Sequence, residues 1–233
     1  MKIFLYQNFF QKKYMLLLVI HFYCCPTEAQ DFKADLMRVK KLFSDSKRIH
    51  AVISIKGFAS KAGEDLFDEK AIVFKDSSKY YSQFNGMEML LNDTYFVLVN
   101  HPLKRIQFVL RTSQTINPMD GQNFVPNLDS LLRAYGEVSY KGKTNELSHY
   151  EIIHGKGAMK STNMYFNATS GMLKRIEYYY ATGQIVQIEF EAFDTNPQWP
   201  HDKFSEAKYW ATQNGKKTVT PAFAGYKLIS NAN

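Results

Sequence analysis

The residues of this chain that are best suited to chemistry are its histidines and its paired carboxylates. His149 and His154 lie five positions apart in a stretch with strand-like alternation, so they are expected to face opposite sides. Glu189 and Glu191 share the polar face of an alternating strand, where solvated carboxylates are expected rather than a general acid and base. The chain has no His-Glu-x-x-His, Gly-x-Ser-x-Gly or phosphate-binding glycine pattern. The sequence therefore predicts no enzyme activity, no metal site and no cofactor.

Aromatic and methionine side chains are the more informative group. The chain has 15 Tyr, 18 Phe and 9 Met, and many of them fall in stretches with strand-like alternation. Such residues can fill the core of a sandwich or barrel. They can equally line a concave apolar groove that accepts acyl chains, with methionine providing adaptable contacts. Both interpretations stay open, and a short apolar helix expected at residues 127–135 favours the groove because it would form a natural lid.

The elements that must position these side chains are mainly β-strands. One face of the last long strand carries Val186, Ile188, Phe190 and Ala192, and the other face carries Gln187, Glu189 and Glu191. A period of two is typical of a half-buried strand, and one dry face favours an antiparallel sheet. Strands are predicted at residues 51–58, 66–75, 79–85, 87–91, 94–99, 104–111, 137–141, 147–154, 160–167, 172–180 and 184–193.

Three helices are predicted beside the strands. At residues 32–43 the apolar positions recur with the helical period. At residues 127–135, Asn127 provides an N-cap and Gly136 a stop. A third short helix is predicted at residues 204–212. The apolar positions of the first two helices, which we expect to cover the sheet, are Phe32, Leu36, Val39, Leu42, Phe43, Leu128, Leu131, Leu132 and Tyr135.

The start of the chain has the features of a secretory signal peptide. A basic pair, Lys12-Lys13, precedes an apolar run at residues 14–25 that is shorter than the ~20 residues needed to cross a bilayer. Small residues up to Ala29 predict cleavage there, which removes residues 1–29 and leaves residues 30–233 as a single domain. We therefore expect secretion across the inner membrane into the periplasm.

The cysteines and the charge limit the partners further. Cys24 and Cys25 both lie in the signal segment, and a lipid anchor on either of them in the envelope is the alternative to cleavage. The formal net charge of +7 comes from scattered basic pairs, without a basic cluster or a nucleic-acid-binding motif. We expect no nucleic-acid partner and at most peripheral contact with a membrane.

The last predicted hairpin has a definite pattern: a Gly-x-Leu-Lys-x-Ile strand, a turn with Gly, an Ile-x-Phe-x-x-Phe strand and then Asn-Pro. The residues of this pattern are Gly171, Leu173, Lys174, Ile176, Gly183, Ile188, Phe190, Phe193, Asn196 and Pro197. The pattern resembles that of the LolA/LolB-like family of periplasmic lipoprotein carriers. A second likeness to this family lies in the strand run from residue 72 to residue 106.

The resemblance implies a mostly β (α+β) fold, a single strongly curved, incompletely closed antiparallel β-barrel of about eleven strands with lid helices. Residues 30–233 would form one LolA-like half-barrel domain with a C-terminal extension. Such a protein would carry the acyl chains of lipid or lipoprotein in a concave apolar groove, with the helices at residues 32–43 and 127–135 as lids. The predicted lining is Ile53, Ile55, Ile72, Phe74, Ile106, Phe108, Leu110, Leu128, Leu131, Leu132, Val186, Ile188 and Phe190.

The alternative is a non-enzymatic envelope scaffold or interaction module with a filled barrel core. It would bind envelope protein partners through the edges of its sheet or through the tail that contains Phe223, Tyr226 and Leu228. A hollow that holds a hydrocarbon chain distinguishes the carrier from the scaffold.

Overall fold

The computed structural model describes residues 32–61, 63–112 and 137–230, which belong to one compact unit. Helix α2 (Phe32–Asp45) comes first, and two short 3₁₀ turns, η1 (Glu206–Lys208) and η2 (Pro221–Phe223), lie near the end. The strands are β1 (Arg48–Phe58), β2 (Asp65–Asp76), β3 (Lys79–Phe84), β4 (Met87–Leu91), β5 (Tyr95–Asn100), β6 (Arg105–Leu110), β7 (Val138–Thr144), β8 (Leu147–Ile153), β9 (Met159–Asn167), β10 (Leu173–Tyr180), β11 (Ile185–Asp194), β12 (Trp210–Gln213), β13 (Lys216–Val219) and β14 (Lys227–Ser230).

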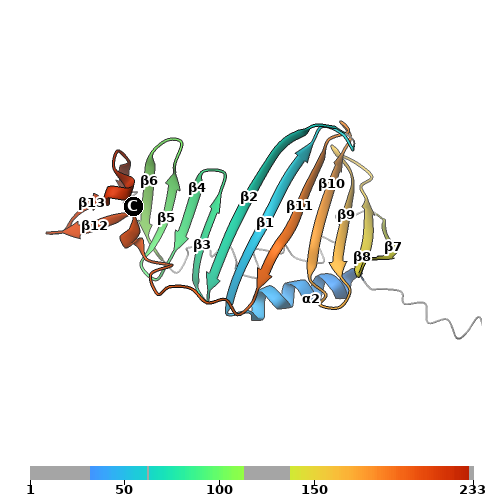
Figure 1. Cartoon of the computed structure of the whole chain (residues 1–233), viewed down its shortest axis with the longest axis horizontal. Helices are drawn as coiled ribbons and strands as arrows, with labels where there is room; N and C mark the ends of the chain where they lie inside the picture. The colour runs from blue at the N-terminus through green and yellow to red at the C-terminus, as the bar shows by residue number, and fades with distance from the viewer. Residues whose placement is uncertain (1–31, 62, 113–136, 231–233) are drawn as a thin grey trace, which may run out of the picture. The chain divides into compact units, whose positions relative to one another are not determined.

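Twelve of these strands form one sheet, in the order β14-β6-β5-β4-β3-β2-β1-β11-β10-β9-β8-β7, and β12 and β13 form a separate ribbon (Figure 1). All pairings in the sheet are antiparallel except that of β14 with β6. The two edge strands, β14 and β7, do not pair with each other, so the curled sheet stays open. This confirms the predicted mostly β, incompletely closed antiparallel fold. The eleven predicted strands correspond to β1–β11, with ends displaced by at most three residues.

Helix α2 packs on one face of the sheet, which we call the α2 face. Its residues Phe32, Leu36, Val39 and Phe43 are between 1% and 7% exposed, as their helical spacing predicts. In Figure 1 the helix lies along the lower ends of β1, β11, β10 and β9. The sheet residues of this core are Ile49, Ala51, Val73, Tyr80, Leu91, Tyr150, Ile152, Met164, Phe166, Leu173 and Phe190.

Two buried polar side chains hold α2 in place. The hydroxyl of Tyr150 on β8 donates to Asp35 Oδ2 at 2.7 Å. Lys75 Nζ on β2 donates to the backbone oxygens of Phe43 at 2.8 Å and Ser46 at 3.0 Å. A cation at this position satisfies carbonyls that a helix C-terminus leaves without intrahelical partners. The helix is therefore tied to two strands that are far apart in the sheet order.

The opposite face of β3–β6 carries a second core, which we call the tail face because the segment after β11 covers it. Successive strand residues point to opposite faces, so Tyr80 belongs to the α2-face core and Tyr81 to the tail-face core. The large aromatic content therefore fills two cores, one on each side of the sheet. The tail-face core consists of Tyr81, Leu90, Val97, Val99, Ile106, Phe108, Phe204, Tyr209, Trp210 and Phe223.

The prediction of a helix at residues 204–212 is wrong. Only η1 is helical there, and Trp210 already begins strand β12. Phe204, Tyr209 and Trp210 all turn into the tail-face core, and this packing decides the local backbone because intrinsic helix propensity is a weak preference. Strands β12, β13 and β14 were not predicted. The predicted helix at residues 127–135 lies outside the described residues.

Candidate functional site

Five of the predicted groove residues come together on the α2 face. Ile53 lies opposite Phe190, and Ile55 lies opposite Ile188, in the pairing of β1 with β11. Val186 lies two positions from Ile188 and so shares its face. Ile53 packs against the α2-face core, and Phe190 belongs to it. The alternation of β11 therefore predicts its apolar face from Val186 to Phe190, but the register shift beyond Phe190 places Ala192 opposite Val52, on the other face.

The expectation that all the strand residues of the predicted groove line one face is corrected by the register. Val73 belongs to the α2-face core, so its neighbours Ile72 and Phe74 point to the tail face. Ile106 and Phe108 are buried in the tail-face core, and Leu110, two positions further, is 66% exposed. These residues cannot line a groove together with Ile55 and Ile188 because the sheet separates them. Leu128, Leu131 and Leu132 lie outside the described residues.

A row of isoleucines crosses the centre of the α2 face. Ile55, Ile188 and Ile176 are direct cross-strand neighbours on β1, β11 and β10. We call these three residues the isoleucine row. Each is only half-buried, although they lie on the same face as the closely packed core under α2. The isoleucine row is therefore a partly exposed apolar surface that crosses three adjacent strands.

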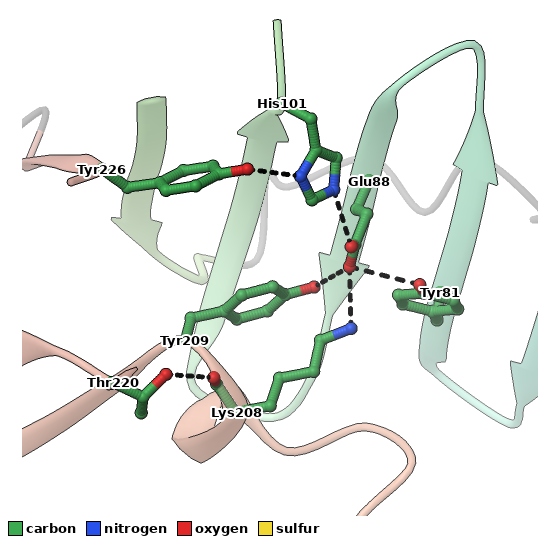
Figure 2. A network of polar contacts seen from close by, with 7 residues as sticks. All are labelled: Tyr81, Glu88, His101, Lys208, Tyr209, Thr220 and Tyr226. Carbon is green, nitrogen blue, oxygen red and sulfur yellow. Dashed lines mark hydrogen bonds and ion pairs between the residues drawn. The ribbon is translucent and has the colours of Figure 1, made fainter. Parts of the chain in front are cut away.

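The tail face contains a polar cluster around Glu88, which Figure 2 shows. Glu88 Oε2 accepts hydrogen bonds from Lys208 Nζ at 2.7 Å, from the Tyr209 hydroxyl at 2.9 Å and from the Tyr81 hydroxyl at 3.2 Å. His101 Nε2 contacts Glu88 Oε1 at 2.8 Å. The carboxylate side chain is only 10% exposed. We call this group the Glu88 cluster.

His101 extends the cluster to the last part of the chain. Its Nδ1 contacts the hydroxyl of Tyr226 at 2.7 Å. A carboxylate only accepts hydrogen bonds, so the neutral imidazole with its proton on Nε2 satisfies both contacts. In that tautomer Nε2 donates to Glu88 and Nδ1 accepts from Tyr226. The carboxylate on β4 is thereby connected to three residues of the segment that covers the tail face.

The Glu88 carboxyl is held in its charged form. Burial acts to raise its pKa, but the hydrogen bond and the charge of Lys208, with hydrogen bonds from Tyr209 and His101, bring the pKa below its ordinary value. Burial, and the charge and hydrogen bond of Glu88, raise the pKa of Tyr209 and of Tyr81. Both phenols therefore remain O–H donors at neutral pH. The cluster is a charged anchor for the covering segment rather than an arrangement for proton transfer.

The sequence pattern alone does not single out Glu88. The available signal is a carboxylate between Met87 and Met89. It lies on the same face of β4 as Leu90, which is buried in the tail-face core. Its partners Lys208 and Tyr209 are 120 and 121 positions away, so no local pattern connects them.

The other candidate groups have local partners. His149 Nε2 contacts Asn163 Oδ1 at 3.0 Å, and His154 Nε2 contacts Thr162 Oγ1 at 2.8 Å. Glu191 accepts from Lys70 at 2.8 Å in a largely exposed pair. Among the residues with described positions, no group of three or more His, Cys, Asp or Glu could hold a metal ion. Within the same ranges, no helix is both long enough and apolar enough to cross a membrane.

Comparison with known proteins gives structural neighbours only. No family model and no curated protein matches the sequence. An uncharacterized conserved protein from Thermus thermophilus matches at 9% identity, over 85% of this chain and 98% of that one, with a TM-score of 0.47. The Pseudomonas aeruginosa MucA/MucB complex matches at 9% identity, over 81% and 62%, with a TM-score of 0.41. A LolA superfamily protein from Nitrosomonas europaea matches at 8% identity, over 75% and 97%, with a TM-score of 0.32.

Proposed function

We propose that this protein is an exported, non-enzymatic carrier that binds the hydrocarbon chains of a lipid or a lipoprotein on its α2 face. The observation that carries the proposal is the isoleucine row, which is apolar and half-buried on three adjacent strands. Each methylene removed from water contributes about 0.8 kcal/mol, so a chain lying across this row would be held firmly but reversibly. The signal peptide predicted at residues 1–29 accounts for the export.

The composition of the row suits an aliphatic ligand. Branched aliphatic side chains offer dispersion contacts and no hydrogen-bond donor or acceptor, so they do not select a polar head group. The half-buried residues Met89 on β4 and Phe96 on β5 pack against the same α2-face core. Methionine adapts its shape to irregular partners. The same surface can therefore accept chains of different length.

Binding of an apolar probe tests the role of the isoleucine row. Replacing Ile188 by Glu is expected to weaken binding of a fluorescent fatty acid about tenfold or more, because a hydrocarbon chain cannot desolvate a carboxylate without cost. Ala192→Glu, at an exposed position of the same strand, is the matched control and should bind like the unmodified protein. Thermal unfolding of both variants checks that they are folded. Equal affinity of the two variants, or no binding by the unmodified protein, would refute the proposal.

The second candidate is an envelope scaffold that binds protein partners. It is favoured by the close packing under α2, where Phe43 is 1% exposed and Phe166 on β9 is also 1% exposed. That part of the face is already filled by the chain itself. Mass spectrometry of the protein purified from its own envelope separates the candidates. Recovered lipid or acylated peptide supports the carrier, whereas a stable protein partner without bound lipid supports the scaffold.

A further inference from the structure

A polar cleft lies where several strands end, away from the isoleucine row. The beginning of β1, the end of β2 and the turn between β4 and β5 form one wall, and the segment after β11 forms the other. The cleft has a volume of about 510 Å³, which is within the range of about 300–1,000 Å³ that is typical of small-molecule sites. Its lining includes Arg48, Asp76, Asn92, Asp93, Trp199 and Glu206.

An indole ring provides an apolar wall in this otherwise polar cleft. Trp199 is half-buried, and its ring makes edge contacts with Phe74 at 5.9 Å and Phe204 at 5.7 Å between centroids. The guanidinium carbon of Arg48 lies over one face of the ring, 5.5 Å from the centroid, so a ligand has to stack on the opposite face. These contacts fix the orientation of the indole. A fixed aromatic face is electron-rich and attracts the weakly positive C–H groups of a ligand.

Planar polar side chains beside the indole are also held in place. The Asn92 amide nitrogen donates to Glu206 Oε2 at 2.6 Å and to the Phe204 carbonyl at 3.2 Å. The Asn92 amide oxygen accepts from the backbone N–H groups of Thr94 and Tyr95. These contacts fix Asn92 and one oxygen of Glu206. Binding of a ligand there therefore requires little further loss of side-chain entropy. The four contacts use the whole amide of Asn92, so the second carboxylate oxygen of Glu206 is the group left here to accept from a ligand hydroxyl.

The charges of the cleft argue against an anionic ligand. Arg48 pairs with Asp76 at 3.2 Å, and Lys79 pairs with Asp93 at 2.9 Å. The two cations of the lining are thus each balanced by a carboxylate, and Glu206 adds a further negative charge. A phosphate or a nucleotide would need an excess of positive charge. A neutral ligand with many hydroxyl groups meets no such requirement.

The geometry points to a binding site for a neutral saccharide of one or two sugar rings. The C–H face of a pyranose ring would stack on Trp199. Its hydroxyl groups would donate to Asp93 and Glu206 and accept from Arg48. This site is on the tail-face side and is independent of the hydrocarbon surface proposed above.

Saccharide titration tests this inference directly. Calorimetric titration of the purified protein with diacetylchitobiose, maltose and lactose is expected to show binding of at least one of them, with a dissociation constant of about 1 mM or below. Trp199→Ala should weaken that binding about tenfold or more. Asp93→Ala should also weaken it, and this variant keeps the fold because an exposed pair with Lys79 contributes little to stability.

Tyr140→Ala removes an aromatic side chain that is 39% exposed on β7, outside the cleft, and should leave saccharide binding unchanged. The inference is overturned if none of the three sugars binds, or if Asp93→Ala binds as tightly as the unmodified protein. Tighter binding of inorganic phosphate than of any sugar would also overturn it.

Discussion

Replacing Phe43 by Ala is expected to lower the free energy of unfolding by about 4 kcal/mol. Phe43 is 1% exposed, and its ring lies 6.5 Å from that of Phe190 and 5.0 Å from that of Phe193, between centroids. Removing it leaves a cavity between α2 and β11 that the two remaining rings cannot fill. Denaturant unfolding followed by circular dichroism measures the loss.

Met37→Ala is the matched control for this change. Met37 lies on the same helix but is 48% exposed, so its replacement should alter the free energy of unfolding by no more than about 0.5 kcal/mol. A loss below about 1 kcal/mol for Phe43→Ala would show that α2 is held loosely on the sheet. That outcome would favour a helix that lifts away as a lid.

The packing of α2 bears on how a carrier would work. Four apolar side chains of the helix are buried against the sheet, and exposing each of them costs about 1.5–3 kcal/mol. Tyr150 and Lys75 add two buried hydrogen-bonded contacts. Detaching the whole helix from the sheet therefore requires a large free energy. A ligand that lies on the isoleucine row beside α2 avoids this cost, and the lid role predicted for residues 32–43 stays a prediction.

Replacing Glu88 by Gln is expected to lower the free energy of unfolding by about 3 kcal/mol. An amide of the same shape places an NH₂ donor and one oxygen where the carboxylate now accepts from Lys208, Tyr209, Tyr81 and His101. At least one buried donor then loses its partner. Glu191→Gln, in the exposed pair with Lys70, is the matched control and should cost less than about 1 kcal/mol.

The Glu88 contribution is expected to depend on pH in a defined direction. The pKa of its carboxyl is lower in the folded protein than its ordinary value of 4.5. The stabilisation is therefore complete above pH 4.5 and disappears as the pH falls through the lower folded-state value. The difference in unfolding free energy between the unmodified protein and Glu88→Gln should shrink on acidification below pH 4.5. A difference that stays constant down to pH 2 or so would contradict the assigned charge state.

The local patterns of the sequence predicted most of the elements. Alternation with a period of two located β1–β11, and the helical period located α2, because these patterns reflect which side of an element is buried. The break between the predicted strands at residues 87–91 and 94–99 is a turn, which Asn92 closes by accepting from the N–H groups of Thr94 and Tyr95. The isoleucine row was partly predicted, since Ile55 and Ile188 were included in the groove and Ile176 was not.

The tertiary structure decided which face of the sheet each strand residue points to, which the strand pattern alone leaves open. Ile72-Val73-Phe74 and Tyr80-Tyr81 are apolar on both sides, so the sequence does not say which residue meets α2 and which meets the tail. The register and the covering segments settle it, and they divide the predicted lining between two faces. The Glu88 cluster and the cleft at Trp199 depend on contacts between residues more than a hundred positions apart. The sequence by itself determined strands β1–β11 and the first helix, because those signals are local. The face that each strand buries, the two cores and the candidate sites arise from long-range packing that only the folded chain brings about.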